Sequence, residues 1–406
     1  MKAGWQIKTI GDVCEFQRGL TYAKGDEVDV SDNVVLRATN IDLSTNLLTF
    51  DELKYISDKV IVPETKKVKK GSLMICTASG SKSHLGKVAY IDDDYGYAFG
   101  GFMGMLTPLS GLLPKYLFHL MTSEEYKDFI SSLSDGANIN NLKFDDLKRF
   151  PVPVPPLSEQ QRIVAILDEA FDGIATARAN AEQNLQNARA IFESHLQAVF
   201  SQRGDGWVER PLGETASFRN GINFSKSSKG VPVRILGVKD FQNNFWAPQE
   251  DLDFIRPDRV VPDADILQEN DIVFVRSNGN PELIGRCVVV GNLDERTTHS
   301  GFTIRARLHD SSVMPTYLCH FLKSRTARRE LVDGGNGANI RSLNQGTLAR
   351  LIVPLPSSLD EQREIVDRVE AMKMETQRLE SLYQRKIDAL DELKKSLLNQ
   401  AFSGNL

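Results

Sequence analysis

Two polar loops carry the side chains of this sequence that are best suited to recognition chemistry. Each loop lies between two glycines that are separated by five residues, at residues 80–86 and again at 279–285. A nucleotide-binding phosphate loop has four residues between its glycines and a Ser or Thr after the Lys, but here Val88 follows Gly86 and Lys87. We therefore expect no nucleotide at these loops. Their side chains can instead reach the base edges or phosphates of a nucleic acid, and an ordinary hairpin connection is the alternative.

Further clusters of Arg, Asn and Lys flank the two loops. Arginine can bind guanine and asparagine can bind adenine through two hydrogen bonds each, although these residue types more commonly make turns. A lysine run at residues 66–70 can lie along phosphates or be a solvated surface. The candidate nucleic-acid-binding residues are Arg18, Thr21, Lys67, Ser81, Lys82, Ser83, His84, Asn138, Asn140, Lys143, Arg219, Asn220, Asn223, Arg276, Asn278, Asn280, Arg286, Asn339, Arg341 and Asn344.

No set of residues has the spacing of a catalytic or metal site. His119 and His320 lie in helical segments without an acid at metal-ligand spacing, so we interpret them as helix-face histidines. The sequence contains no G-x-S-x-G, H-E-x-x-H or dinucleotide-binding motif. We expect no catalytic residue and no cofactor on this chain.

The sequence contains an internal duplication with a period of about 200 residues. Trp5 matches Trp207, the Gly101-Phe102 pair matches Gly301-Phe302, and the segment 136–139 matches 337–340, all at offsets between 199 and 202. A period this long indicates a duplicated domain instead of a solenoid. We expect a first domain at 1–156, a helical region at 157–203, a second domain at 204–356 and a C-terminal helical region at 357–406.

Each domain has the pattern of an α+β fold. Short β-branched or aromatic runs predict strands at 34–37, 73–76 and 102–106, and at 231–236, 272–275 and 302–305. A helix is expected near 115–133 and near 316–332, followed by a loop rich in Gly and Asn and a short helix. A proline-rich exit at 151–156 or 353–356 then leads stiffly into the long helix.

Two long helices follow the domains, beginning near Leu157 and Leu359, where Ser158 and Asp360 can cap the first amides. At about 1.5 Å per residue each is on the order of 60 Å long. Apolar or small residues step by three and four along each helix, as a coiled-coil seam requires. The expected seam is Leu167, Ala170, Ile174, Ala177, Ala181, Ala188 and Ile191, and Val369, Met372, Thr376, Leu379, Tyr383, Leu390 and Leu393, with Asn184, His195 and Lys386 as polar seam positions.

Two such helices can pack antiparallel with one domain at each end, related by a pseudo-two-fold axis. A homodimeric DNA-binding protein places two recognition elements about 34–36 Å or a multiple of it apart on a palindrome. A fused and diverged dimer would recognise two different half-sites, and its helices would fix the distance between them.

Composition predicts a water-soluble protein, and its net negative charge argues against binding nucleic acid by bulk electrostatics alone, although local basic faces are possible on the two domains. The net charge is −5, and the two helical regions carry an excess of three and two acids, so the two domains together are neutral. Acidic helices suit protein partners, and a solvated helix face is the alternative. Four scattered cysteines and the absence of a long apolar run predict a cytoplasmic protein without disulfides, signal peptide or membrane span.

The whole chain resembles the specificity subunits of Type I restriction-modification systems. The resemblance rests on LSEQQRIV at 157–164 and LDEQREIV at 359–366 after the proline-rich exits, on the Trp-x(4)-Ile/Leu-Gly starts and on the Phe-Ser ends at 200–201 and 402–403. It implies two target-recognition domains, each binding one half of an asymmetric bipartite site in double-stranded DNA, with the helices setting the spacer.

The resemblance also implies the partners. Two modification (methyltransferase) subunits would dock on the helices, carry S-adenosylmethionine and methylate adenine. Restriction subunits would add ATP- and Mg-dependent DNA cleavage, so the cofactors would lie on partner subunits. The alternative is a non-catalytic coiled-coil scaffold whose domains bind proteins, which would not shift duplex DNA sequence-selectively.

Overall fold

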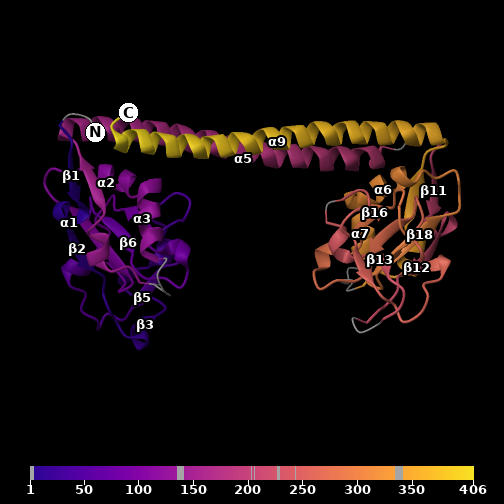
Figure 1. The fold of residues 1–406 in the computed structure, drawn as a ribbon, viewed down its shortest axis with the longest axis horizontal. Helices are drawn as coiled ribbons and strands as arrows, with labels where there is room; N and C mark the ends of the chain where they lie inside the picture. The colour runs from indigo at the N-terminus through magenta and orange to yellow at the C-terminus, as the bar shows by residue number, and fades with distance from the viewer. Residues whose placement is uncertain are drawn as a thin grey trace. The chain divides into compact units, whose positions relative to one another are not determined.

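The computed structural model describes residues 4–134, 141–202, 204, 206–225, 229–242, 244–333 and 342–406. The chain divides into two compact units, Met1–Ala181 with Arg385–Leu406, and Glu182–Gln384. Each unit holds one α+β domain and part of each of two 45-residue helices, α5 (Leu157–Ser201) and α9 (Leu359–Ser403) (Figure 1). The division by contacts cuts through both helices, so the domain boundaries expected from the sequence stay predictions. None of the described helices is long and apolar enough to span a membrane.

The first domain contains two sheets and a strand pair. The main sheet is antiparallel and has the order β2 (Cys14–Arg18), β9 (Met103–Pro108), β6 (Leu73–Cys76) and β7 (Val88–Tyr90). The second sheet has the order β3 (Glu27–Val28), β5 (Lys54–Ile56), β4 (Asn33–Leu36) and β8 (Ala98–Phe99). The predicted strands at 34–37, 73–76 and 102–106 are therefore confirmed within one residue at their starts.

The second domain repeats this arrangement. Its main sheet has the order β12 (Ala216–Asn220), β18 (Thr303–Leu308), β15 (Ile272–Val275) and β16 (Cys287–Val289), and its second sheet the order β14 (Asp253–Ile255), β13 (Val233–Leu236) and β17 (Thr297–His299). Equivalent strands pair in the same sense, including the parallel pairs β4–β8 and β13–β17. The structure confirms the internal duplication.

The single helix expected after each main sheet is in fact two helices. They are α2 (Pro114–Leu120) and α3 (Glu124–Ser134) in the first domain, and α6 (Pro315–Lys323) and α7 (Arg325–Asp333) in the second. The break occurs where the hydroxyl of Ser123 accepts from the Tyr126 amide and that of Ser324 accepts from the Ala327 amide, each at 3.3 Å. These serines start new helices because they satisfy free N-terminal amides. The short helices are α1 (Ile10–Val13), α4 (Phe144–Leu147) and α8 (Gln345–Arg350).

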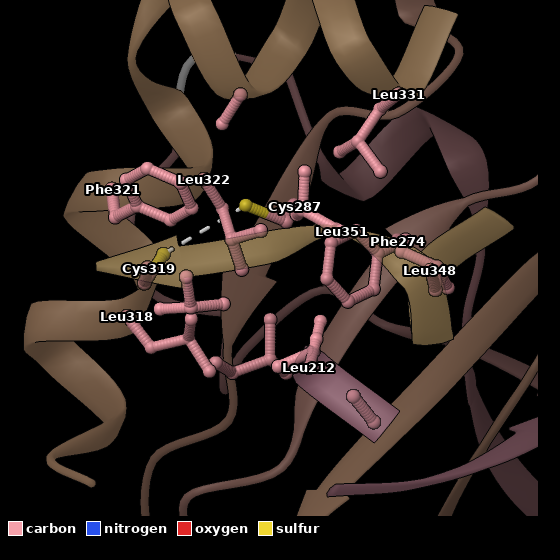
Figure 2. Close-up of a cluster of buried hydrophobic side chains, with 14 of the residues drawn as sticks. Leu212, Phe274, Cys287, Leu318, Cys319, Phe321, Leu322, Leu331, Leu348 and Leu351 are labelled. Carbon is pink, nitrogen blue, oxygen red and sulfur yellow. Dashed lines mark hydrogen bonds between the residues drawn. The ribbon is translucent and has the colours of Figure 1, made fainter. Parts of the chain in front are cut away.

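The hydrophobic core of each domain lies between the main sheet and these helices. In the second domain Phe274 and Cys287 of the sheet face Cys319 and Leu322 of α6, and all four side chains are buried (Figure 2). The Sγ atoms of Cys287 and Cys319 are 3.9 Å apart, and the four cysteines are free. Burial of this apolar surface supplies the main favourable free energy of the fold.

The proline-rich exits are strands, which the sequence did not indicate. β10 (Pro151–Val154) pairs antiparallel with β1 (Gln6–Thr9), and β19 (Ile352–Leu355) pairs with β11 (Val208–Pro211). Each pair is a two-stranded sheet, where every strand has a free edge and proline is tolerated. The exit into each long helix is therefore tied to the first strand of its own domain.

Within each unit the segments of α5 and α9 pack side by side and antiparallel (Figure 1). In the first unit Arg178 forms an ion pair with Asp391, and in the second Arg189 Nε lies 3.1 Å from Glu380. The expected seam is correct at its centre, where Ile174, Ala181 and Thr376 are buried.

Several details of the helix prediction are wrong. Ile191 and Leu393 are half exposed and Lys386 is exposed, because the seam passes through Phe192 and the buried Ile387. Ser158 and Asp360 lie inside their helices instead of capping them; the hydroxyl of Ser358 accepts from the Glu361 amide at 3.2 Å.

Candidate functional site

Most of the predicted contact residues of the first domain converge at one end of its main sheet. β2 and β6 both pair antiparallel with β9, so their carboxyl ends and the start of β9 meet at the same end. We call the segments 18–22, 77–84, 100–103 and 141–144 the sheet-end surface of the first domain. It includes Arg18, Thr21, Ser81, Ser83, His84 and Lys143.

Backbone hydrogen bonds hold these segments together. The amides of Thr77 and Ala78 donate to the Phe102 carbonyl at 2.9 and 3.1 Å, and the Leu142 amide donates to Thr77 at 2.6 Å. Gly19 packs so closely that a Cβ there would lie 1.9 Å from the Gly100 carbonyl oxygen. The surface is therefore an assembly of loops whose backbone positions are fixed by one another.

The side chains of this surface point largely to solvent. The Arg18 guanidinium lies over the Phe144 ring at 5.5 Å, and Lys66 donates to the Arg18 carbonyl at 2.8 Å. Ser81 and Ser83 share a hydroxyl hydrogen bond of 2.8 Å, and Lys143 is exposed. Cations and hydroxyls with free capacity at one rigid edge can bind phosphates and base edges.

The second domain has an equivalent sheet-end surface, formed by residues 219–223, 276–283, 300–303 and 342–345. The Phe302 carbonyl accepts from the amides of Arg276 and Ser277 at 2.8 and 3.3 Å, and the Leu343 amide donates to Arg276 at 2.8 Å. A Cβ on Gly221 would lie 2.1 Å from the Ser300 carbonyl oxygen. The framework is thus the same in both domains.

More of the predicted contact side chains of the second domain than of the first already form hydrogen bonds or ion pairs within their own domain. Arg219 forms an ion pair with the buried Asp265, and Arg286 donates to the Glu282 and Gln242 carbonyls. Asn280 caps the 3₁₀ turn η8 (Pro281–Leu283), where its side chain accepts from the Glu282 amide at 3.0 Å. Asn344 caps α8, where its side chain accepts from the Thr347 amide at 2.9 Å. The side chains of Asn220 and Asn278 accept from Gln345 and from the Asn280 amide. Asn223 is exposed, and Arg276 is half-buried with a long 3.4 Å contact to Gly301.

Some predicted residues are away from these surfaces or lie outside the described residues. Lys67 forms a bridge with Ala98 in the backbone, and its ammonium pairs with Glu64 at 2.5 Å. Asn138, Asn140, Asn339 and Arg341 are outside the described part of the chain, as is the side chain of Lys82. Their roles as nucleic-acid contacts stay predictions.

The prediction of contact residues missed two side chains at these surfaces, since Phe102 is 73% exposed and Phe302 is 61% exposed. Lys66, which belongs to the predicted lysine run, reaches the same edge as Arg18. The signal was present, because the Gly-Phe pair recurs at equivalent positions in the two halves. It was not used because an isolated Phe in a β-rich segment is usually a core residue.

The second domain holds a polar cluster along β18, with Asp271 and Arg307 at the end of the main sheet opposite the sheet-end surface and with His299 and Thr303 next to that surface. Arg307 binds Asp271 through two hydrogen bonds of 2.7 Å, and the His299 imidazole contacts Thr303 Oγ1 at 2.9 Å. Burial, followed by the nearby Arg305 guanidinium, lowers the pKa of His299 to about 3, so the imidazole is neutral at pH 7. Burial also lowers the pKa of Arg305.

Each domain is attached to its own part of the long helices by equivalent polar contacts. The buried Gln160 accepts from the Leu113 amide and donates to the Gly111 carbonyl, and Gln362 does the same with Met314 and Ser312. These glutamines follow the helix starts and fix the loop before α2 or α6.

The two helix-face histidines also contact the long helices. His119 Nε2 lies 2.8 Å from Asp168, and His320 Nε2 lies 2.9 Å from Glu370. Burial lowers the pKa of both histidines, that of His320 to about 4. They are helix-face residues, as expected, and the described residues contain no cluster of His, Cys, Asp and Glu that could hold a metal ion.

Comparisons with known proteins agree with this architecture. The family model of the Type I restriction modification DNA specificity domain matches residues 2–186. The chain is 28% identical to the EcoKI specificity subunit of Escherichia coli K12 over 99% of its own length and 89% of that protein, and equally to the StySPI specificity subunit of Salmonella potsdam.

Two solved structures have the same fold over the full length. One, from a study of assembly and conformational transition of the type I R-M system, aligns with a TM-score of 0.79 at 17% identity and covers 100% of this chain and 99% of that chain. The HsdS subunit from Thermoanaerobacter tengcongensis aligns with a TM-score of 0.63 at 18% identity and covers 100% and 98%.

Proposed function

We propose that this chain is a specificity subunit of a Type I restriction-modification system, in keeping with its similarity to such subunits over nearly its whole length, and that its two sheet-end surfaces each bind one half of an asymmetric bipartite DNA sequence. The observation that carries this proposal is the repeated framework with different side chains. Arg18, Ser81 and Lys143 stand on the first surface, whereas Asn223, Arg276 and Asn278 stand on the second. Different donors and acceptors on equivalent loops select different bases.

The chemistry in this proposal belongs to partner subunits. Two modification subunits with bound S-adenosylmethionine would methylate adenine, and restriction subunits with ATP and Mg would cleave DNA. The chain itself would supply recognition and no catalytic group. We place the complex in the cytoplasm, in keeping with four free cysteines.

The long helices would set the spacer between the half-sites and dock the modification subunits. Their acidic excess supports a protein-facing role. Ile191 and Leu393 add to this support, since they are equivalent by the repeat and about half exposed. Exposed aliphatic side chains on an otherwise polar helix suit a protein interface.

A domain exchange tests the proposal. Residues 1–156 are replaced by the corresponding domain of another specificity subunit, and the methylated sequence is mapped genome-wide in cells that also express the modification subunit. We expect one half of the sequence to change while the other half and the spacer length are retained. A change in both halves would refute independent recognition, and the absence of sequence-selective methylation or binding would favour the scaffold.

A further inference from the structure

Phe102 and Phe302 combine a fixed backbone with an unpacked ring. Their rings are 73% and 61% exposed, the two highest values among phenylalanines of the described residues, whereas Met103 and Thr303, which follow them, are buried. Leaving a phenyl ring in water forgoes the favourable free energy of burying it. The same cost occurs at equivalent positions in both domains, so it is a repeated feature of the fold.

The backbone around each ring is held from several sides. The Phe102 carbonyl accepts from two successive amides and from the Thr77 hydroxyl at 2.9 Å, and the Met103 amide donates to Gly100 at 2.8 Å. In the second domain the Phe302 amide donates to the Ser300 hydroxyl at 3.3 Å and the Thr303 amide donates to Ser300 at 2.8 Å. A ring presented on a rigid backbone loses little entropy when it binds.

The surroundings of the rings favour a nucleic base over a protein surface. Gly101 lies beside Thr21, and the strand that continues from Phe102 pairs with Arg18. Gly301 lies beside Asn223, and Arg276 and Ser277 hold the Phe302 carbonyl. Protein interfaces have a contiguous apolar centre, whereas DNA surfaces combine single aromatic or apolar wedges with polar and cationic side chains.

We propose that Phe102 and Phe302 each insert against the face of a base at one step of the half-site that their domain binds. The inference rests on the proposed function and adds a contact that the polar residues cannot supply. The ring gives affinity through stacking and unstacks that step locally. Because the described part of each sheet-end surface, as defined above, presents one such ring, each half-site has one such step.

The test uses the full complex of this chain with its modification subunits and a duplex that contains the mapped site. We expect Phe102→Ala and Phe302→Ala each to weaken binding about 5- to 150-fold, the range found for loss of one base–aromatic stack. The slope of log K against log salt concentration should stay unchanged, because a neutral ring releases no counterion. Phe102→Trp should retain affinity, since indole also stacks.

Matched controls come from aliphatic side chains of the same domains that are at least as exposed as the two rings. Ile61 is 87% exposed and Val260 is 79% exposed, and both occupy equivalent loops outside the sheet-end surfaces. Ile61→Ala and Val260→Ala should leave DNA binding unchanged. Thermal unfolding of each variant shows whether the domain still folds.

Three results would overturn the inference. The alanine variants could bind DNA like the wild type, they could recruit fewer modification subunits by native mass spectrometry, or the salt slope could fall as for a lost phosphate contact. If the unaltered complex binds no specific sequence, the proposed function itself fails. If the unaltered complex binds a specific sequence and the phenylalanine variants bind it with the same affinity, the inference alone fails.

Discussion

The two domains hold different chemistry at the same place on one backbone. Ser72 and Thr107 of the first domain share a hydroxyl hydrogen bond of 2.9 Å, whereas Asp271 and Arg307 form a two-bond ion pair at the equivalent positions. The backbone around them is unchanged, since the amides of Ser72 and Asp271 donate to Lys69 and Gln268 in the same way. A partly buried hydroxyl pair has thus been exchanged for an ion pair with a buried carboxylate and a partly buried guanidinium, without a change of fold.

The exchange extends toward the sheet-end surface. Phe99, Met103 and Met105 are buried together in the first domain, and His299, Thr303 and Arg305 replace them in the second. Backbone pairing and close glycine contacts are common to both domains, while the interior side chains are not. The frame can therefore keep its shape while the chemistry around it diverges, as the proposed binding of two different sequences requires.

Substitutions at the close backbone contacts of Gly19 and Gly221 should destabilise the two domains more than any other change considered below. In Gly19→Ala and Gly221→Ala the new Cβ meets a backbone carbonyl at 1.9 and 2.1 Å. Because backbone atoms cannot move aside cheaply, we expect each change to destabilise its own domain by at least about 3 kcal/mol. Hydrogen exchange of β9 and β18 amides measures this. Gly25→Ala and Gly279→Ala, which meet nothing within 4 Å, are the controls, and a stable Gly19→Ala variant would contradict a shared frame.

Loss of the Asp271–Arg307 ion pair should lower the free energy of unfolding more than loss of the Ser72–Thr107 hydroxyl pair does. Asp271→Ala leaves the Arg307 guanidinium without its carboxylate and should destabilise the second domain by about 3 kcal/mol. Ser72→Ala removes one neutral hydrogen bond and should cost about 1 kcal/mol. Urea unfolding followed by domain-resolved hydrogen exchange compares the two. Equal costs would show that the exchange of chemistry has no energetic consequence.

The stability of the second domain should decrease more at low pH than that of the first domain because of His299. Burial lowers the pKa of His299 to about 3, while the unfolded imidazole titrates near 6.5. Between these pH values the unfolded state binds a proton that the folded state does not, so stability falls as pH falls from about 6.5 toward about 3. The charged groups that act on His299 are Arg305, Asp265, Arg219 and Arg307.

The first domain has Phe99 at this position, so His299→Phe transfers its chemistry to the second domain. We expect the loss of stability between pH 7 and pH 4.5 to become smaller in this variant. His320, whose pKa is lowered to about 4, continues to contribute in the same sense. Thermal unfolding of the second domain at both pH values is the measurement, and an unchanged difference would exclude His299 as a cause.

The smallest expected effect is on the salt dependence of DNA binding. Lys143→Gln in the first domain and Arg276→Gln in the second should each lower the slope of log K against log salt by about 0.9 if the side chain binds one phosphate. Lys59, an exposed lysine after β5, is the control. Titrations at several salt concentrations decide this, and a constant slope would remove either residue from the phosphate contacts.

Local signals were enough for much of the architecture. The strand at 73–76 is a run of four buried apolar residues between turn residues, and the long helices lack any interrupting proline, so both were predictable. The break at Ser123 was missed because a capping serine inside a helical pattern looks like any polar position. The strand at Pro151–Val154 was missed because proline disfavours strands, and only its partner β1 shows that an edge accepts it.

The candidate site divides in the same way. Arg18, Ser81 and Lys143 were identified by residue type and do meet at one sheet end. The same criterion chose Asn280 and Asn344, whose side chains are used as caps, and passed over Phe102. Residue type indicates what a side chain can bind, but its exposure and its local partners depend on segments far away in the sequence.

The sequence by itself determined the duplication, the two long helices and the positions of the main strands, because repeats, periodicity and turn residues are local or self-comparing signals. Only the tertiary structure decided that Asp271 pairs with Arg307 and that Arg219 forms an ion pair with Asp265. It also decided that the side chains of Phe102 and Phe302 remain exposed to solvent. These outcomes depend on which strands become neighbours and in which register. A change of register by one residue would turn each of these side chains to the opposite face.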